Sequence, residues 1–438
     1  MFEEKINHTT DALKFVSFST ISIVCFFVKM PFLGNRIIID FCSSWLQTNL
    51  MVPVRILTVI GIGYGAMEPL VRRTVHGTAN WVYAICRVVG FIGCLMYVFN
   101  IGPAWLIASI LKPGLDSVII PGGIMQILGG LALVLMSSYG LFEFIGVYAR
   151  PFMRKLFKLP GLAALNVVTS YVGNYIPGSQ VANQMYSDGH YTNREMARVL
   201  CAFGTNSLVF LLVFVNICGT MAYWNWLVVS ITLTLIIVGA FTTRLWPIHH
   251  APNTYIEGIT PVQENDPKDS KWKTAVNEAL NTAHSADSVF KLLSHQALFC
   301  IIQFTKLMSI SMGFYVLISL FVKFVPLFDY LAYIFLPLTK LLGHVDAFSV
   351  AKALAICPID VMVACTQSVG LNLYSRFTIN VVVYTTVICV ANTVPAFIAT
   401  KCKLKFLDYV IIGFERVILS VITASLIAKL LILIGVLI

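Results

Sequence analysis

The chain has 438 residues, of which 58% are hydrophobic and 11% charged. This apolar share exceeds the roughly 45–50% of soluble domains and excludes a soluble globule. The formal net charge of +10 would suggest nucleic-acid binding in a soluble protein, but an excess of Lys and Arg in cytoplasmic loops accounts for it in a membrane protein. We therefore expect an all-α polytopic membrane protein in a lipid bilayer, with no nucleic-acid partner.

Nine apolar segments are long enough to cross a membrane, since about 20 helical residues span a hydrocarbon core of about 30 Å. They lie at about 12–30, 50–70, 80–101, 117–147, 195–218, 223–246, 297–322, 378–400 and 408–437. Lys and Arg outside these segments are more numerous on the side of the N-terminus. This asymmetry predicts a multi-pass protein with a cytoplasmic N-terminus.

Two parts of the chain repeat each other. A shift of 186 residues places Glu143 on Asp329 and Asn206 on Asn392, with no gap between them. We expect a three-helix N-terminal scaffold (1–115), a first repeat (116–247), a cytoplasmic linker with a surface helix that begins near Asp269 or Ser270 (248–296), and a second repeat (297–438). With three crossings in each repeat the second must be inverted, which is typical of secondary transporters.

Each repeat contains a re-entrant hairpin followed by an interrupted span. The first hairpin is expected at about 159–185, with its tip at Pro177-Gly178-Ser179-Gln180, and the next span breaks at Gly204-Thr205-Asn206-Ser207. The second hairpin is expected at about 345–372, and its span breaks at residues 391–395. Its tip is expected to include Pro358, Asp360, Thr366, Gln367 and Ser368. Irregular backbone at membrane depth is tolerated where protein buries it or where it lines a wet cavity.

Hairpin tips and helix breaks expose helix ends, whose free N–H and carbonyl groups can hold ions or polar solutes. We expect substrate contacts from Gln180, Asn183, Asp360, Thr366, Gln367, Ser368, Asn392 and Thr393. We expect a coupling cation, Na⁺ or H⁺, near Asn174, Ser179, Thr205, Asn206 and Ser207. The alternative is that these side chains are hydrogen-bonded links between packed spans.

Ionisable residues within apolar segments are costly and therefore suggest function. Asp360, at the second tip, could bind a cation, a substrate hydroxyl or a proton, with Lys306 as its partner, or it could cap a half-helix. Glu143 and Asp329 are expected to be interfacial anchors or gates. Arg87 and Arg416 are expected to snorkel to the cytoplasmic interface.

No catalytic pattern is present in the sequence. It lacks a phosphate-binding glycine loop, HExxH, GxSxG and paired CxxC. The cysteines occur singly in apolar segments and read as packing residues, while the histidines fall mostly in loops. We expect neither an enzyme nor an organic cofactor.

The runs GSQVANQMY (178–186), GHYTNRE (189–195) and AFGTNS (202–207) resemble the YjiH-like bacterial membrane proteins with "nucleoside recognition" Gate domains. Gate domains are shared with concentrative nucleoside transporters. The resemblance implies a bacterial inner-membrane location, a homo-oligomer, and sodium coordination by Asn174, Ser179, Asn206 and Ser207. The first tip here lacks an acidic residue, and Asp360 stands in the second.

The expected function is therefore secondary transport of a small polar metabolite, with a nucleoside-like cargo as the first hypothesis. A small organic anion or an amino acid is the alternative cargo. A non-transporting scaffold in envelope or spore assembly is the alternative class.

Overall fold

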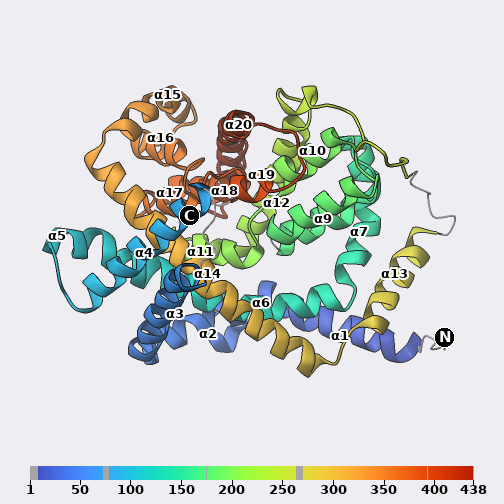
Figure 1. Cartoon of the computed structure of the whole chain (residues 1–438), viewed down its shortest axis with the longest axis horizontal. Helices are drawn as coiled ribbons and strands as arrows, with labels where there is room; N and C mark the ends of the chain where they lie inside the picture. Colours follow the sequence, from blue (N-terminus) through green and yellow to red (C-terminus); the bar gives the residue numbers. More distant parts are fainter. Residues whose placement is uncertain (1–7, 73–77, 174, 263–269, 392, 438) are drawn as a thin grey trace.

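The computed structural model describes residues 8–72, 78–173, 175–262, 270–391 and 393–437. Every regular element in these residues is helical (Figure 1). Asn174 and Asn392, both predicted site residues, lie outside the described residues.

The first part of the chain contains twelve helices. They are α1 (His8–Phe27), α2 (Ile38–Asn49), α3 (Met51–Val71), α4 (Thr78–Val98), α5 (Ala104–Leu106), α6 (Ile120–Ser138), α7 (Leu141–Phe152), α8 (Ala163–Val168), α9 (Tyr175–Ser187), α10 (Asn193–Phe203), α11 (Leu208–Ile217) and α12 (Trp224–Thr242). Two π-helical turns, η2 (Ile107–Leu111) and η3 (Pro113–Ile119), join α5 to α6, and a third, η5 (Thr169–Gly173), follows α8.

The second part contains α13 (Lys271–Ser285), α14 (Val289–Phe324), α15 (Leu327–Leu341), α16 (Ala347–Ile356), α17 (Val361–Thr366), α18 (Leu373–Thr385), α19 (Thr393–Ile398) and α20 (Phe406–Leu433). Elements of the two parts begin 186 residues apart: α7 at 141 and α15 at 327, α9 at 175 and α17 at 361. Packing is reciprocal as well, because α9 contacts α19 and α11 contacts α17. The repeat predicted from the sequence is therefore visible in the order of the elements.

Eight helical stretches in the described residues are long and apolar enough to cross a membrane. The predicted span at 378–400 is not among them because it is the interrupted span of the second repeat. α18 ends at Thr385 and α19 begins at Thr393, so neither piece alone is long enough. The span predicted at 117–147 was misplaced. That helical stretch covers Ala104–Ser138, and Gly140, at φ +93°, separates it from α7.

The long helix α14 is the centre of the N-terminal scaffold, where it packs against α3, α4 and α6 (Figure 1). Glycines allow its backbone to approach its neighbours. A Cβ added at Gly313 would lie 1.8 Å from the Cys86 carbonyl oxygen of α4, and one added at Gly65 of α3 would lie 1.9 Å from the Thr305 carbonyl oxygen. Small residues that bring backbones together are a common basis of helix packing in membranes.

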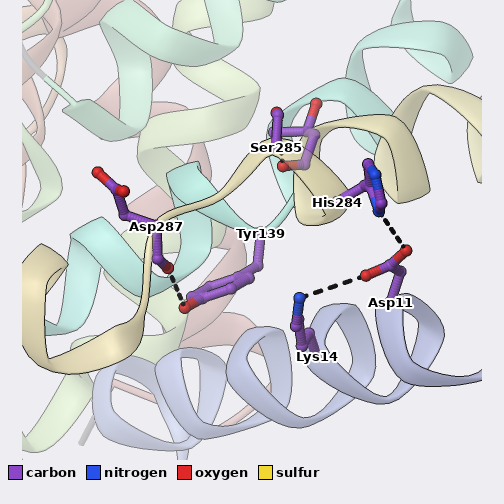
Figure 2. Close-up of polar contacts among 7 residues, drawn as sticks. Asp11, Lys14, Tyr139, His284, Ser285 and Asp287 are labelled. Carbon is purple, nitrogen blue, oxygen red and sulfur yellow. Dashed lines mark hydrogen bonds and ion pairs between the residues drawn. The ribbon is translucent and has the colours of Figure 1, made fainter. Parts of the chain in front are cut away.

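The linker helix α13 is docked rather than solvated. Its N-cap is Ser270, as predicted, but Ala275, Ala279 and Ala283 are buried where it packs against α1 and α7. At its end, His284 Nδ1 lies 2.9 Å from the buried Asp11 carboxylate of α1 (Figure 2). The surface helix of the linker is therefore anchored, because it has a small apolar face that fits between two neighbours.

Polar contacts fix the same interface on either side of the alanine face. The Tyr139 hydroxyl, at the end of α6, donates to the Asp287 carbonyl oxygen (3.2 Å, Figure 2). Arg150 of α7 donates to both carboxylate oxygens of Glu278, at 2.7 and 2.9 Å. Burial, with a further contribution from the Glu278 carboxylate, raises the pKa of Glu143 in α7.

The close approach of α4 and α14 yields a first prediction. Gly313→Ala is expected to lower the thermal stability of the purified protein, by roughly 1–3 kcal/mol or more, because the backbones must separate. Gly146→Ala in α7 is the matched control, since its nearest neighbour would be 3.6 Å away. Equal stability of the two variants would contradict the packing described here.

Candidate functional site

The first interrupted helix stops and restarts where the sequence predicts. α10 ends at Phe203, and the Thr205 N–H donates back to the Phe203 carbonyl (2.7 Å), which turns the chain at Gly204. Gly204 has no space for a side chain, because a Cβ there would lie 2.5 Å from the Phe397 ring of α19. Ser207 then caps α11 by accepting from the Phe210 N–H (3.2 Å).

The first hairpin turns earlier than predicted. Pro177, Gly178, Ser179 and Gln180 are in the first turns of α9 rather than at a tip. Proline is tolerated in the first turn of a helix, where its missing N–H costs no bond, so the Pro-Gly pair was misread as a turn. The two arms are side by side, since the terminal amide of Asn166 in α8 lies 3.0 Å from the Gly178 carbonyl oxygen and 3.2 Å from the Ala182 nitrogen.

Ser170 in η5 links this hairpin to the first break. A Cβ on Gly178 would lie 1.9 Å from Ser170 Oγ, so the two segments touch. On the other side, the Thr205 hydroxyl donates to the Ser170 carbonyl oxygen (3.2 Å). Ser170 was not among the site residues predicted from the sequence. A π-helical turn, which is frequent at functional sites, is the structural feature that marks it.

The predicted cation set is only partly brought together. Thr205, Asn206 and Ser207 are buried at the break, whereas Ser179 donates to Ile176 within its own helix (2.8 Å). Two predicted substrate residues of α9 lie elsewhere. Gln180 is exposed, and Asn183 accepts from the Lys401 N–H (2.8 Å).

The second hairpin turns at Pro358 and Ile359, as predicted, between α16 and α17. Asp360 is buried and caps α17 by accepting from the Val363 N–H (2.8 Å), which is the capping alternative. Its expected partner Lys306 lies instead 3.7 Å from Glu68 of α3. The Lys306–Asp360 pair was therefore a wrong prediction, because the packing of α3 against α14 supplies a carboxylate that sequence spacing does not show.

The turn of the second hairpin also supports the second break. The Val390 N–H donates to the Pro358 carbonyl (2.9 Å), and the Ala391 N–H donates to the Ile359 carbonyl (3.0 Å). Thr393 bridges the loop, donating to the Val387 carbonyl (2.7 Å) and accepting from the Cys389 N–H (2.8 Å). Thr393 is therefore a link within the break, the alternative role given to it above.

Arg416 of α20 holds the end of the interrupted helix α18. Its fully buried guanidinium donates to the Thr385 carbonyl (2.7 Å), to the Thr386 carbonyl (2.9 Å) and to the Thr242 hydroxyl of α12 (3.3 Å). The expected snorkelling was wrong, because the carbonyl end of α18 carries partial negative charge inside the protein. Val387, which follows Thr386, has φ +62°, and this conformation is strained for a β-branched side chain.

The prediction that Thr366, Gln367 and Ser368 lie at the tip was wrong. They lie at the far end of α17. Thr366 and Gln367 line a cavity there, while Ser368 is buried and donates to the Cys365 carbonyl (2.7 Å). Among the described residues that were predicted to contact substrate, Thr366 and Gln367 therefore line a cavity.

Cavity 1, of about 530 Å³, lies between α14, the C-terminal end of α3, the first part of α4 and the second break. Its lining includes Glu68, Arg87, Tyr175, Lys306, Ala391 and Pro395. Tyr175 begins α9 of the first repeat, and Ala391 and Pro395 belong to the broken span of the second. The wall facing the scaffold is thus built from both repeats.

Cavity 2, of about 860 Å³, lies farther along α14. Its lining includes Asp116, Asn216, Tyr315, Asp329, Lys352 and Gln367. Asn216 ends α11 of the first repeat, and Gln367 follows α17 of the second. The two cavities therefore use the two reciprocal contacts of the repeat, α9 with α19 and α11 with α17.

The two cavities lie toward opposite ends of α3. Glu68 and Arg72, which line cavity 1, are at its C-terminal end, whereas Gln47, which lines cavity 2, precedes its first residue. A helix of 21 residues is about 30 Å long at 1.5 Å per residue. Residues between 306 and 311 of α14 line cavity 1 and residues between 315 and 323 line cavity 2, so only a short part of α14 separates them.

Comparison with known proteins gives distant similarities. No family model matches the chain. An uncharacterised protein of Alkalihalophilus pseudofirmus is 25% identical over 443 residues, which cover 95% of this chain and 94% of that protein. The YjiH-like family stays a prediction.

Two solved structures of the concentrative nucleoside transporter CNTnw are similar in outline. One is an inward-facing substrate-bound state (13% identical, TM-score 0.45, 98% of this chain and 93% of that one). The other is a doubly substituted variant in an outward-facing state (14% identical, TM-score 0.45, 98% of this chain and 94% of that one).

The role of Arg416 gives the second prediction. Arg416→Met is expected to lower the free energy of unfolding by roughly 2–6 kcal/mol, because two buried carbonyls lose their donor at about 1–3 kcal/mol each. Ser230→Ala is the control, since Ser230 is buried at the equivalent position of α12 but bonds only within its own helix. Thermal unfolding in detergent compares them, and a neutral Arg416→Met would refute the assigned role.

Proposed function

We propose that the chain is a secondary active transporter that moves a small polar solute between cavity 1 and cavity 2. The observation that carries this proposal is the pair of cavities on one helix, α14, toward opposite ends of α3. Each is closed by a hairpin arm of one repeat and a broken-helix segment of the other. Discontinuous helices of two repeats that meet around a central site are typical of alternating access.

The contacts within each repeat are suited to such a movement. The second hairpin is joined to the second break by backbone bonds at Pro358 and Ile359, so the two can move as one unit. The first hairpin is joined to the first break at Ser170. A solute that binds better in one arrangement than in the other shifts their populations by its differential affinity.

For the coupling ion we propose Na⁺ or H⁺ at the first break. Unwound backbone carbonyls and half-helix ends coordinate such ions in transporters. Support comes from Thr205, Asn206 and Ser207, which are buried together beside Ser170. Thr205→Val is the informative substitution, because it removes a hydroxyl and keeps the shape.

A nucleoside-like solute is the first cargo to test, with small organic anions and amino acids as alternatives. We further propose a homo-oligomer in a bacterial inner membrane, as the family resemblance implies. The charge asymmetry of the loops supports a cytoplasmic N-terminus. A scaffold in envelope or spore assembly is the competing class, and it predicts no flux of any solute.

Cysteine accessibility tests the proposal. Ser311 lines cavity 1 and Ser319 lines cavity 2, on the same helix. With the half-buried Cys25, Cys42 and Cys402 changed to Ser, Ser311→Cys should react with a membrane-impermeant thiol reagent from the cytoplasmic side and Ser319→Cys from the other side. A transported solute should change both rates in opposite directions.

Leu317→Cys, on an exposed part of α14, is the control and should not respond to the solute. Reaction of both serine positions from one side would contradict two-sided access. Proteoliposome uptake with a sodium or a proton gradient then identifies the coupling ion. Absence of uptake for every solute class, with the labelling unaffected by any of them, would favour the scaffold.

A further inference from the structure

We infer that cavity 1 binds the anionic group of an organic solute, a carboxylate or a phosphate. This inference rests on the proposed transport function and specifies its cargo class. Among the described residues, three cationic side chains, Arg72, Arg87 and Lys306, line the cavity together with one carboxylate, Glu68. The lining therefore carries an excess of positive charge.

Glu68 does not satisfy the cations around it. One of its oxygens, Oε1, lies 3.6 Å from Arg72 and 3.7 Å from Lys306, both beyond hydrogen-bond distance. A carboxylate shared at these distances leaves the ammonium of Lys306 with donors for another acceptor. An oxyanion between Lys306 and Arg87 would supply that acceptor.

Arg87 also has donor capacity left. One terminal nitrogen donates to the Gly65 carbonyl of α3 (3.1 Å), while the buried Nε has no hydrogen-bond partner among the described residues. The single bond to Gly65 holds the guanidinium in place beside the cavity. Guanidinium groups bind carboxylates and phosphates through paired N–H donors, so a second acceptor suits this geometry.

The depth of these charges supports a functional role. Arg87 lies well inside the candidate span Trp81–Val98, and Lys306 lies at the middle of α14. Charges at such positions are expensive and are retained mainly along substrate or ion pathways.

Cavity 2 offers an internal comparison, because its charges are matched. The Asp116 carboxylate forms an ion pair with Arg55 (3.0 Å) and accepts a hydrogen bond from the Tyr97 hydroxyl (2.5 Å). Lys352 and Asp329 form an ion pair at 2.7 Å. Lys323 lies over the Trp105 ring, 4.2 Å from its centroid. The excess of positive charge at cavity 1 therefore contrasts with the matched charges of cavity 2.

The rest of cavity 1 fits an organic body of small size. Tyr83 and Tyr175 provide aromatic surface, and Ile310 and Pro395 provide apolar surface, within about 530 Å³. Two sources could present the anion: a water-soluble organic acid or phosphate ester, or the phosphate of a lipid headgroup. We assign the soluble solute, because Tyr175 and Pro395 belong to the hairpin and the broken span that the transport cycle would move.

The test uses the purified full chain in phosphatidylcholine nanodiscs and matched neutral and anionic compounds. The pairs are uridine with uridine 5′-monophosphate, and succinamide with succinate, extended to a panel of small mono- and dicarboxylates and phosphate esters. At least one anion should raise the melting temperature by several degrees while its neutral analogue does not. Arg87→Gln and Lys306→Gln should each weaken the affinity for that anion, measured from the concentration dependence of the melting temperature, about tenfold or more.

Lys291→Gln is the matched control. Lys291 is also on α14 but is exposed and pairs with Asp287 outside the cavity, so its response should equal that of the unmodified chain. The inference would be overturned if the neutral and the anionic compound of each pair raised the melting temperature equally and the two substitutions changed neither shift. The proposed transport function would then still hold for a neutral cargo. No response to any soluble anion would also overturn it.

Two further outcomes separate the inference from the proposed function. Stabilisation by phosphatidylglycerol, but by no soluble anion, would overturn the cargo assignment in favour of a lipid headgroup. Anion binding that depends on Arg87 and Lys306, without uptake into proteoliposomes, would support the anion site and contradict the transport function.

Discussion

The structure depends on how two helices are interrupted while their free backbone groups stay paired. Hydrocarbon offers no hydrogen bonds, so each N–H or carbonyl released by a break needs a partner within the protein. At the first break Thr205 and Ser207 supply hydroxyls. At the second, the hairpin turn accepts from Val390 and Ala391, and Arg416 donates to the end of α18. These pairings determine where the hairpins sit.

The two repeats solve the same problem with different chemistry. The first break relies on neutral hydroxyls, whereas the second relies on a buried cation, because Arg416 stands where the first repeat has Ser230. The fixed guanidinium of Arg416 already donates to the free carbonyls of the second break, so these carbonyls need no bound ion. The first break has no such cation among its described partners, which is why the coupling ion is proposed there.

The sequence predicted the breaks better than the contacts around them. Gly204, and the Pro358 turn, act locally, so their positions could be recognised from residue type alone. The first tip was misplaced because Pro177 suits a helix start as well as a turn. The partners of Arg416 and Lys306 depend on which helices pack together, α20 on α18 and α14 on α3. One sequence without its tertiary contacts does not contain that information.

The packing of α14 joins the fold to the proposed chemistry. Gly313 and Gly65 bring α4 and α3 so close to α14 that their backbones touch. Because of that approach, Arg87 of α4 and Glu68 of α3 line the same cavity as Lys306 of α14. A looser bundle would place these charges farther apart and allow water to solvate each of them. The clustering of these charges around cavity 1 is therefore a consequence of glycine packing, and this cluster is the feature that we propose selects an anionic cargo.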